Sequence, residues 1–304
     1  MGKWRHFVRL ARPGQYVKNG FVWLPVFFGY RLGDTPACLN TLFAFLAFCL
    51  TASAVYTLND LKDVEEDRRH PVKRRRPLAS GALKNGEALV FLLALLAGAS
   101  LLSLATLPPA FLAVLGAYLA LNVTYSFLLK HRPLIDVAAI ATGFVLRVVA
   151  GGVAAAVPVS HWIITMTFLL ALFLALAKRR DDLLLAGQGH RTRRAADGYS
   201  LEFVSTSMSV MAAVIIVAYL LYTVSPDTIR KHGTDQLYLT GFWVILGLLR
   251  YLQIAFVEEQ TGSPTAVFLK DRFLQAVIIL WILSFFLLLY GSHWIPWLRP
   301  TGAS

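Results

Sequence analysis

Nine apolar stretches dominate this sequence and constrain its fold more than any other feature. Most of them approach the roughly 20 residues that an α-helix needs to cross a bilayer. Their centres lie near Trp23, Phe48, Leu96, Gly116, Val145, Leu170, Val214, Leu246 and Ile282. The first stretch is the weakest, because Lys18 and Asn19 interrupt it. The pattern predicts an all-α integral membrane protein with nine transmembrane helices, in a single polytopic domain over residues 1–304.

The composition excludes the other fold classes. Only 15% of the 304 residues are charged, 57% are hydrophobic, and the mean hydropathy is +0.61. Soluble chains carry about 25% charged residues, and disordered chains are poorer in aromatic and apolar residues. The two cysteines, Cys38 and Cys49, lie roughly 16 Å apart along one predicted helix, which is too far for a disulfide.

The distribution of charge orients the chain and explains its net charge of +12. If the nine stretches span in turn, one side collects 24 of the 29 lysines and arginines. The positive-inside rule makes that side cytoplasmic. We therefore expect a multi-pass protein of the cell (inner) membrane, in contact with membrane lipids and not with nucleic acid. The acidic residues divide 14 to 3 in the same direction, which the rule does not require. The cytoplasmic face therefore needs carboxylates as well as cations.

Five of these fourteen carboxylates lie just after the second stretch, in residues 59–67. On a continuous helix, Asn59, Asp60, Asp63 and Asp67 fall within an arc of roughly 100°. Three like charges on one face repel unless a cation neutralises them, and oxygen ligands suit Mg²⁺. The alternative is a solvated loop beside the membrane, but the spacing favours a metal site.

These residues resemble a known family. Residues 59–67 match the NDxxDxxxD signature of the UbiA superfamily, and residues 76–81 are similar to its RPLxSG stretch. Residues 12–19, residues 125–130, Asp136 and residues 143–147 further resemble one branch, the decaprenyl-phosphate phosphoribosyltransferases. The resemblance implies a UbiA-type bundle of nine transmembrane helices with a cavity that opens to the cytoplasm. It also implies a phosphoribosyl donor in place of a prenyl diphosphate, and a role in cell envelope biosynthesis.

The first motif loop, at about residues 59–86, follows the superfamily pattern. A second motif loop, at about residues 178–200, departs from it. The superfamily usually carries DxxxD there, whereas this chain has the adjacent carboxylates Asp181 and Asp182 after three cations. Adjacent residues on a helix point about 100° apart, so a second metal pair is doubtful. Lys178 and Arg179 could instead hold phosphate, or could anchor a helix end.

Arg147 lies inside the fifth predicted span. An ionisable residue there indicates a functional site by default. Gly143, Gly151 and Gly152 would let a ligand or another backbone approach its helix closely. Two readings stay open, a phosphate-binding role and a structural contact with another helix.

The predicted site contains two groups of residues. The metal-binding and catalytic group is Asp60, Asp63 and Asp67. The substrate-binding group is Lys18, Asn59, Arg76, Tyr125, Lys130, Arg147, Lys178, Arg179, Asp181 and Asp182.

Three functions fit these observations. The first is Mg²⁺-dependent transfer of phosphoribosyl from 5-phosphoribosyl 1-diphosphate to a polyprenyl (decaprenyl-like) phosphate, with release of diphosphate. The second is prenyl transfer to an aromatic acceptor, and the third is a non-catalytic transporter. The first is favoured because an acceptor phosphate is already an anion and needs no general base, and the motifs contain no well-placed base. The transporter is disfavoured because the carboxylates lie at the membrane surface and not near its midplane. A homo-oligomer is left open.

Overall fold

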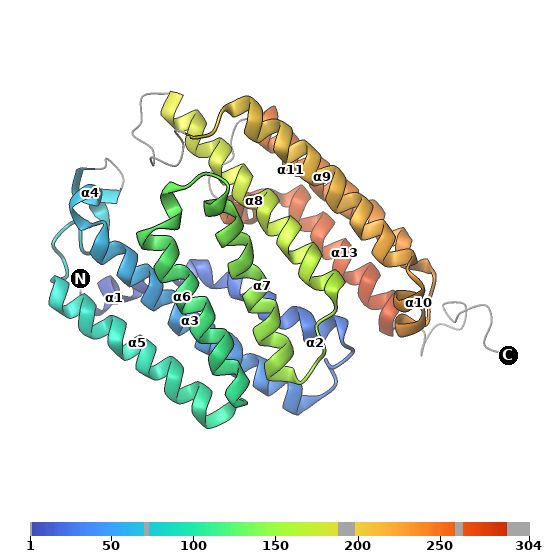
Figure 1. The fold of residues 1–304 in the computed structure, drawn as a ribbon, viewed down its shortest axis with the longest axis horizontal. Helices are drawn as coiled ribbons and strands as arrows, with labels where there is room; N and C mark the ends of the chain where they lie inside the picture. The colour runs from blue at the N-terminus through green and yellow to red at the C-terminus, as the bar shows by residue number, and fades with distance from the viewer. Residues whose placement is uncertain (1, 70–72, 188–197, 259–263, 291–304) are drawn as a thin grey trace. The chain divides into compact units, whose positions relative to one another are not determined.

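The computed structural model describes residues 2–69, 73–187, 198–258 and 264–290, and within these ranges the secondary structure is helical, with no strand (Figure 1). The first half comprises α1 (Trp4–Ala11), the 3₁₀ helix η1 (Pro13–Trp23), α2 (Leu24–Phe28), α3 (Thr35–Lys62), α4 (Val64–Arg69), η2 (Lys73–Arg75), α5 (Asn85–Thr106), α6 (Pro109–Phe127), η3 (Leu129–His131) and α7 (Ile135–Ala155). The second half comprises α8 (His161–Gly187), α9 (Leu201–Val224), α10 (Pro226–His232), η5 (Gln236–Thr240), α11 (Gly241–Phe256), α12 (Pro264–Lys270) and α13 (Arg272–Tyr290).

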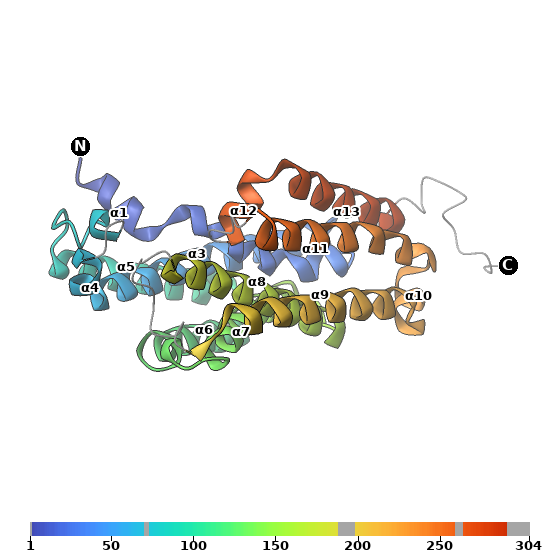
Figure 2. The same cartoon turned by 90° about the horizontal axis from the view of Figure 1, so that it is seen from above.

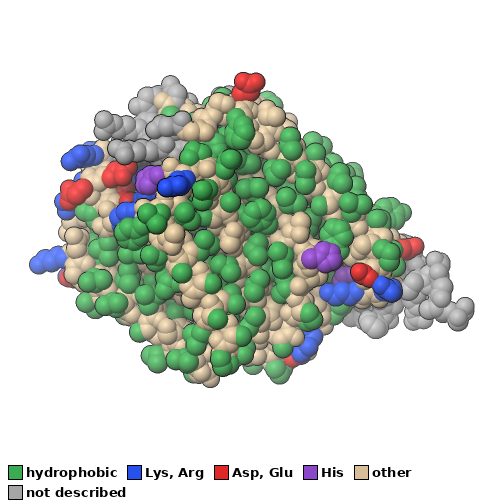
Figure 3. All heavy atoms as spheres, viewed as in Figure 1, with side chains coloured by type: hydrophobic (Ala, Val, Ile, Leu, Met, Phe, Trp, Pro, Cys, Tyr) green, Lys and Arg blue, Asp and Glu red, His purple; other side chains and the backbone are tan. Residues whose placement is uncertain are grey.

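Eight helical segments of the described residues are long and apolar enough to cross a membrane: α3, α5, α6, α7, α8, α9, η5 with α11, and α13. Their outer faces carry large apolar side chains, such as Val90, Leu101 and Leu104 on α5. Hydrophobic side chains also dominate the face in Figure 3, where charged ones are few. Such surface is stable in lipid and unfavourable in water. The prediction of an all-α integral membrane protein is therefore confirmed.

The first apolar stretch folds differently from the others. Its residues belong to η1 and α2, and η1 is a 3₁₀ helix of 11 residues. Such long 3₁₀ runs are uncommon and often mark a functional segment. Lys18 and Asn19, which interrupt the stretch in the sequence, both lie in η1. The count of nine transmembrane helices therefore remains a prediction.

The described helices form two compact units, one up to Phe168 and one from Leu169, with the boundary inside α8. In the first unit α3 packs against α5, α6, α7, α1 and η1. Figure 2 shows α1 on one side of α3, and α6 with α7 on the other. The apolar core between them includes Phe48, Phe111 and Tyr118. A single domain over residues 1–304 is still a prediction.

Helix α3 brings the acidic motif to one end of the first unit. Asp34 caps the start of the helix, where its Oδ1 accepts a hydrogen bond from the backbone N–H of Ala37 at 3.1 Å. The buried hydroxyls of α3 donate to carbonyls one turn earlier, as Thr57 does to Ser53 at 2.8 Å. Polar side chains whose hydrogen bonds are made in this way are tolerated in an apolar surrounding. The helix ends at Lys62, so Asp60 lies in its last turn.

The second unit is built from α9, α11 and α13 with the short α10, η5 and α12. The Tyr219 hydroxyl joins three elements, since it pairs with the Thr240 hydroxyl at 2.6 Å and accepts from Trp281 Nε1 at 2.8 Å. At the other end of α11, Arg250 pairs with Asp271 at 2.6 Å. This ion pair holds the pKa of the Asp271 carboxyl below its usual range.

Candidate functional site

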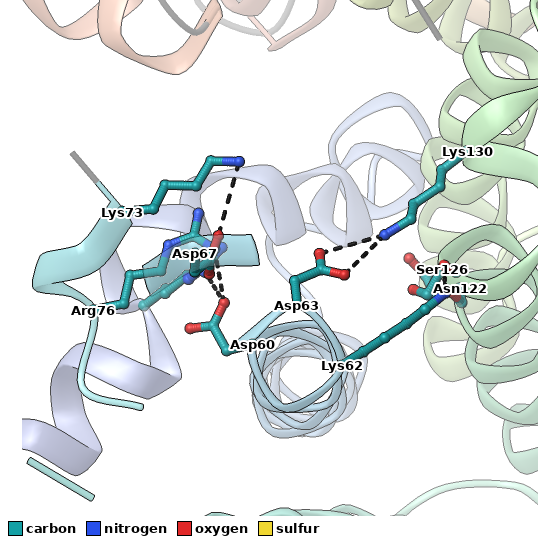
Figure 4. A network of polar contacts seen from close by, with 10 residues as sticks. Asp60, Lys62, Asp63, Asp67, Lys73, Arg76, Asn122, Ser126 and Lys130 are labelled. Carbon is teal, nitrogen blue, oxygen red and sulfur yellow. Dashed lines mark hydrogen bonds and ion pairs between the residues drawn. The ribbon is translucent and has the colours of Figure 1, made fainter. Parts of the chain in front are cut away.

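Asp60 and Asp67 share one cation, Arg76. Arg76 Nη1 lies 3.1 Å from Asp60 Oδ1 and 2.7 Å from Asp67 Oδ2 (Figure 4). Both aspartates are only 2% exposed. Buried carboxylates are stable only when paired and hydrogen-bonded, so Arg76 meets this need for both. The structure therefore places two motif carboxylates and the Arg76 of the RPLxSG stretch in one cluster.

Two more cations adjoin this cluster. Arg12 Nη2 donates to Asp60 Oδ1 at 2.5 Å, and the Arg12 guanidinium lies over the Tyr56 ring, 5.2 Å from its centroid. Lys73 Nζ lies 3.9 Å from Asp67 Oδ1. Arg12 joins α1 to η1 with a left-handed φ of 55°, a conformation that costs energy for a residue with a Cβ and is often found at functional sites.

Asp63 points away from the other two carboxylates, toward Lys130 (Figure 4). Lys130 Nζ lies 3.0 Å from Asp63 Oδ1. The neighbouring Lys62 donates to the carbonyl of Ser126 at 2.5 Å and lies 4.2 Å from the centre of the Phe127 ring. The predicted single face for three carboxylates is therefore not formed, because α3 ends at Lys62 and α4 begins only at Val64. Lys62 and Asp63 instead attach this end of α3 to α6 and η3.

The donor chemistry of the cluster fits a magnesium ion with substrate oxygens as further ligands. Within the described ranges, no three acidic, histidine or cysteine side chains converge as a complete metal-binding group. Mg²⁺ does not need one, since it is usually held by one or two carboxylates together with substrate phosphates and water. Asp60 and Asp67 already face a common positive charge, and they supply the two carboxylates.

Arg147 lies buried in α7, where it bonds to three uncharged acceptors. Its Nε donates to Asn19 Oδ1 at 2.9 Å, Nη1 to the Gly143 carbonyl at 2.8 Å, and Nη2 to the Tyr118 hydroxyl at 2.8 Å. Its guanidinium also stacks over Tyr118 and Phe144. Arg147 therefore links η1, α6 and α7. This is a structural contact with other helices, one of the two roles that the sequence allowed for Arg147. Its phosphate-binding role stays a prediction.

The predicted residues of α8 form a cluster of their own in the second unit. Lys178 contacts both carboxylates, at 3.0 Å for Asp181 and 2.8 Å for Asp182, and Arg179 pairs with Asp182 at 2.7 Å. Both carboxylates are thus paired with cations of their own helix. The doubt about a second metal pair at Asp181 and Asp182 stays a prediction. Residues 188–197 of the predicted motif loop lie outside the described residues.

The remaining predicted residues lie at three places in the first unit. Lys18 is half-buried in η1, Asn59 is half-buried in the last turns of α3, and Tyr125 is half-buried near the end of α6. Their roles in substrate binding stay predictions.

Sequence reasoning left three residues without a role. Arg12 begins the stretch 12–19 that resembles the phosphoribosyltransferase branch, but no role was assigned to it. Lys73 lies in a segment rich in basic residues, so nothing distinguished it from cations that only border the membrane. Tyr251 on α11 is 5% exposed, and its hydroxyl has no hydrogen-bond partner in the described part of the chain. Buried hydroxyls are usually paired, which makes Tyr251 a candidate ligand contact in the second unit. No sequence pattern announces such a hydroxyl.

Comparison with known proteins identifies the same family as the sequence motifs do, over nearly the whole chain. The sequence model described as "UbiA prenyltransferase family" matches residues 22–277. A protein of Corynebacterium glutamicum named decaprenyl-phosphate phosphoribosyltransferase is 34% identical over 293 residues, covering 93% of this chain and 86% of that one. A protein of the same name from Mycolicibacterium smegmatis is 33% identical over 288 residues, covering 90% and 89%.

Among solved structures, a UbiA homolog from Archaeoglobus fulgidus bound to GPP and Mg²⁺ has a similar fold. Its TM-score is 0.69 at 21% identity, with 91% of this chain and 96% of that chain covered. The predicted UbiA-type fold is thereby confirmed. The family match, the curated relatives and the fold agree, and this chain belongs to the UbiA prenyltransferase family.

Proposed function

We propose that this protein transfers the 5-phosphoribosyl group from 5-phosphoribosyl 1-diphosphate to a polyprenyl, decaprenyl-like phosphate and releases diphosphate, with Mg²⁺ as cofactor. The observation that carries the proposal is the buried pair Asp60 and Asp67 with cations around it. Such a cluster suits a substrate that carries several phosphates. The names of the curated relatives support the same reaction.

The charges of the cluster define the task of each group. Asp60 and Asp67 would hold the magnesium ion, which supplies neutralisation of the negative charge that develops on the leaving diphosphate. Arg12, Arg76 and Lys73 would donate hydrogen bonds to anionic donor oxygens, and an arginine can do so in bidentate fashion. Asp63 would keep Lys130 oriented toward the same end of α3, with their present contact at 3.0 Å.

The transfer itself forms one bond and breaks one bond at ribose C1. An oxygen of the acceptor phosphate attacks C1, and the bond from C1 to the diphosphate oxygen breaks with its electron pair on the diphosphate. The acceptor phosphate is already ionised at neutral pH, so no side chain has to remove a proton. The protein therefore has to bind, orient and neutralise charge, and the side chains of the cluster are of the types that do so.

The orientation in the membrane is part of the proposal. The acidic and basic motif residues lie on the side of the chain that collects most lysines and arginines, so this side would face the cytoplasm, where soluble phosphorylated donors are found. The protein would be a multi-pass protein of the inner membrane.

Transfer of radiolabel tests the reaction. Purified protein with Mg²⁺, labelled phosphoribosyl diphosphate and decaprenyl phosphate should form a lipid-soluble labelled product. Asp67→Asn should abolish the product because it removes a buried carboxylate, whereas Glu66→Gln, at an exposed neighbouring position, should retain activity. Consumption of a prenyl diphosphate and an aromatic acid in place of these substrates would replace this function with prenyl transfer.

A further inference from the structure

We propose that Arg76 is the resident counter-ion of Asp60 and Asp67, and that a divalent cation binds this carboxylate pair by exchange with the Arg76 guanidinium. The inference rests on the metal site of the proposed function but not on the transfer reaction. Arg76 would then be a positioning residue whose contacts differ between the metal-free and the metal-bound protein.

The contacts of Arg76 support an exchange. One nitrogen, Nη1, bridges Asp60 and Asp67 at 3.1 and 2.7 Å, which puts a positive charge between the two carboxylates. Within the described residues, these two aspartates are the hydrogen-bond and ion-pair partners of its guanidinium. The Arg76 side chain is 30% exposed while the two carboxylates are 2–3% exposed, so the guanidinium can move into solvent and the carboxylates cannot.

The local charge balance gives the reason for the exchange. Two carboxylates face three cations, namely Arg12, Arg76 and Lys73, which leaves a net charge of +1. A divalent cation added without any release would raise this charge to +3 in a partly buried cluster. Like charges at such short range repel strongly, and the repulsion falls when one cation leaves.

Arg76 is better suited to leave than Arg12. The Arg12 guanidinium has a second anchor, the face of the Tyr56 ring at 5.2 Å, in addition to its bond to Asp60. Cation–π contact adds to its retention. Arg76 also contacts both carboxylates, so its departure frees Oδ2 of Asp67 and leaves Oδ1 of Asp60 with one arginine in place of two.

The exchange would couple metal binding to binding of the anionic donor. In the metal-free state the carboxylates occupy Arg76, and the cluster has little surplus charge for a diphosphate. After exchange the cluster holds one more positive charge, and the Arg76 guanidinium is available to a phosphate oxygen. The metal and the donor should therefore each increase the affinity of the protein for the other.

Mn²⁺ titration without substrates tests the exchange. Free Mn²⁺ is counted by electron paramagnetic resonance in the presence of the purified full-length protein in detergent. Arg76→Gln removes the competing charge, so Mn²⁺ should bind roughly tenfold more tightly, the scale of a charged hydrogen bond that no longer has to be broken. The matched control is Arg68→Gln, which removes a charge from the adjacent helix α4, where Arg68 pairs with the exposed Glu65 at 2.6 Å. It should leave Mn²⁺ affinity nearly unchanged, because exposed charges are screened.

Each outcome decides the inference. Equal or weaker Mn²⁺ binding by Arg76→Gln overturns it, as does an equal gain by Arg68→Gln. If Arg76→Gln does not fold, Arg76→Met is measured in its place, since it also removes the charge while keeping a long side chain and should likewise raise Mn²⁺ affinity. Absence of Mn²⁺ binding in both the wild type and the variant overturns the metal site itself. Tighter binding by Arg76→Gln, together with no phosphoribosyl transfer by the wild type, supports the exchange and rejects only the proposed reaction.

Discussion

The three aspartates of the acidic motif lie close together in the sequence, but their side chains contact different groups. Asp60 and Asp67 converge on Arg76, whereas Asp63 contacts Lys130. Arg147 is a second example, because its three bonds go to acceptors on η1, α6 and its own helix. A buried guanidinium needs such a set of partners, and loss of them is costly.

Arg147→Lys should lower the free energy of unfolding by about 2 kcal/mol, because a single ammonium cannot replace three divergent guanidinium bonds. The measurement is thermal unfolding in detergent. A donor titration on the same preparation tests the phosphate-binding role. Donor affinity about tenfold weaker would retain Arg147 in the site, and an unchanged titration would remove it.

At the scale of elements, close approach between η1 and α7 holds the first apolar stretch in the bundle. A Cβ on Gly151 would lie 1.9 Å from the carbonyl oxygen of Val22, so the two backbones are in contact at this point. The same η1 segment carries Asn19, which contacts both Arg147 and Cys49. Gly151, which lies near Arg147, thus lets another backbone approach α7. The sequence allowed either a backbone or a ligand there.

Gly151→Ala should destabilise the protein by about 1–3 kcal/mol or more, because the new methyl group meets rigid backbone and not a flexible side chain. Gly116→Ala is the matched control, since a Cβ on Gly116 of α6 meets no atom within 4 Å. That change should be neutral or slightly stabilising, because alanine favours helix. Similar melting temperatures of the two variants would contradict the close packing of η1 on α7.

At the scale of the whole molecule, the ends of α3 differ in chemistry. Asp34 and Cys38 lie near its start, while Asp60 lies in its last turn. Its 28 residues span about 42 Å, which is enough to separate the two ends by a bilayer. The orientation of the protein can therefore be determined on this one helix.

A membrane-impermeant maleimide added to intact spheroplasts should label the half-buried Cys38 and not Cys49, which is 5% exposed. In a Cys38→Ala background, a cysteine placed by Arg74→Cys, at an exposed position, should react only after the membrane is permeabilised. The physical reason is the positive-inside rule, which assigns the basic segment to the cytoplasm. Labelling of the Arg74→Cys variant without permeabilisation would reverse the proposed orientation.

The sequence alone determined that the chain is a helical membrane protein, and it located the acidic motif and the basic side. It could do so because a bilayer leaves few options to an apolar chain, namely helices of sufficient length with charges at their ends. The spacing of Asn59 to Asp67 and the RPLxSG stretch also indicated the family.

The tertiary structure decided where helices stop and which charges pair. Periodicity treats residues 59–67 as one helix, but α3 ends at Lys62 and Asp63 turns toward Lys130. Arg12 reaches Asp60 across 48 residues of sequence, and Asn19 reaches Arg147 across 128. No local sequence pattern encodes such pairs, because many basic residues on the same face are chemically equivalent candidates for the same partner. Only the packing of α1, η1 and η2 around the end of α3 selects among them.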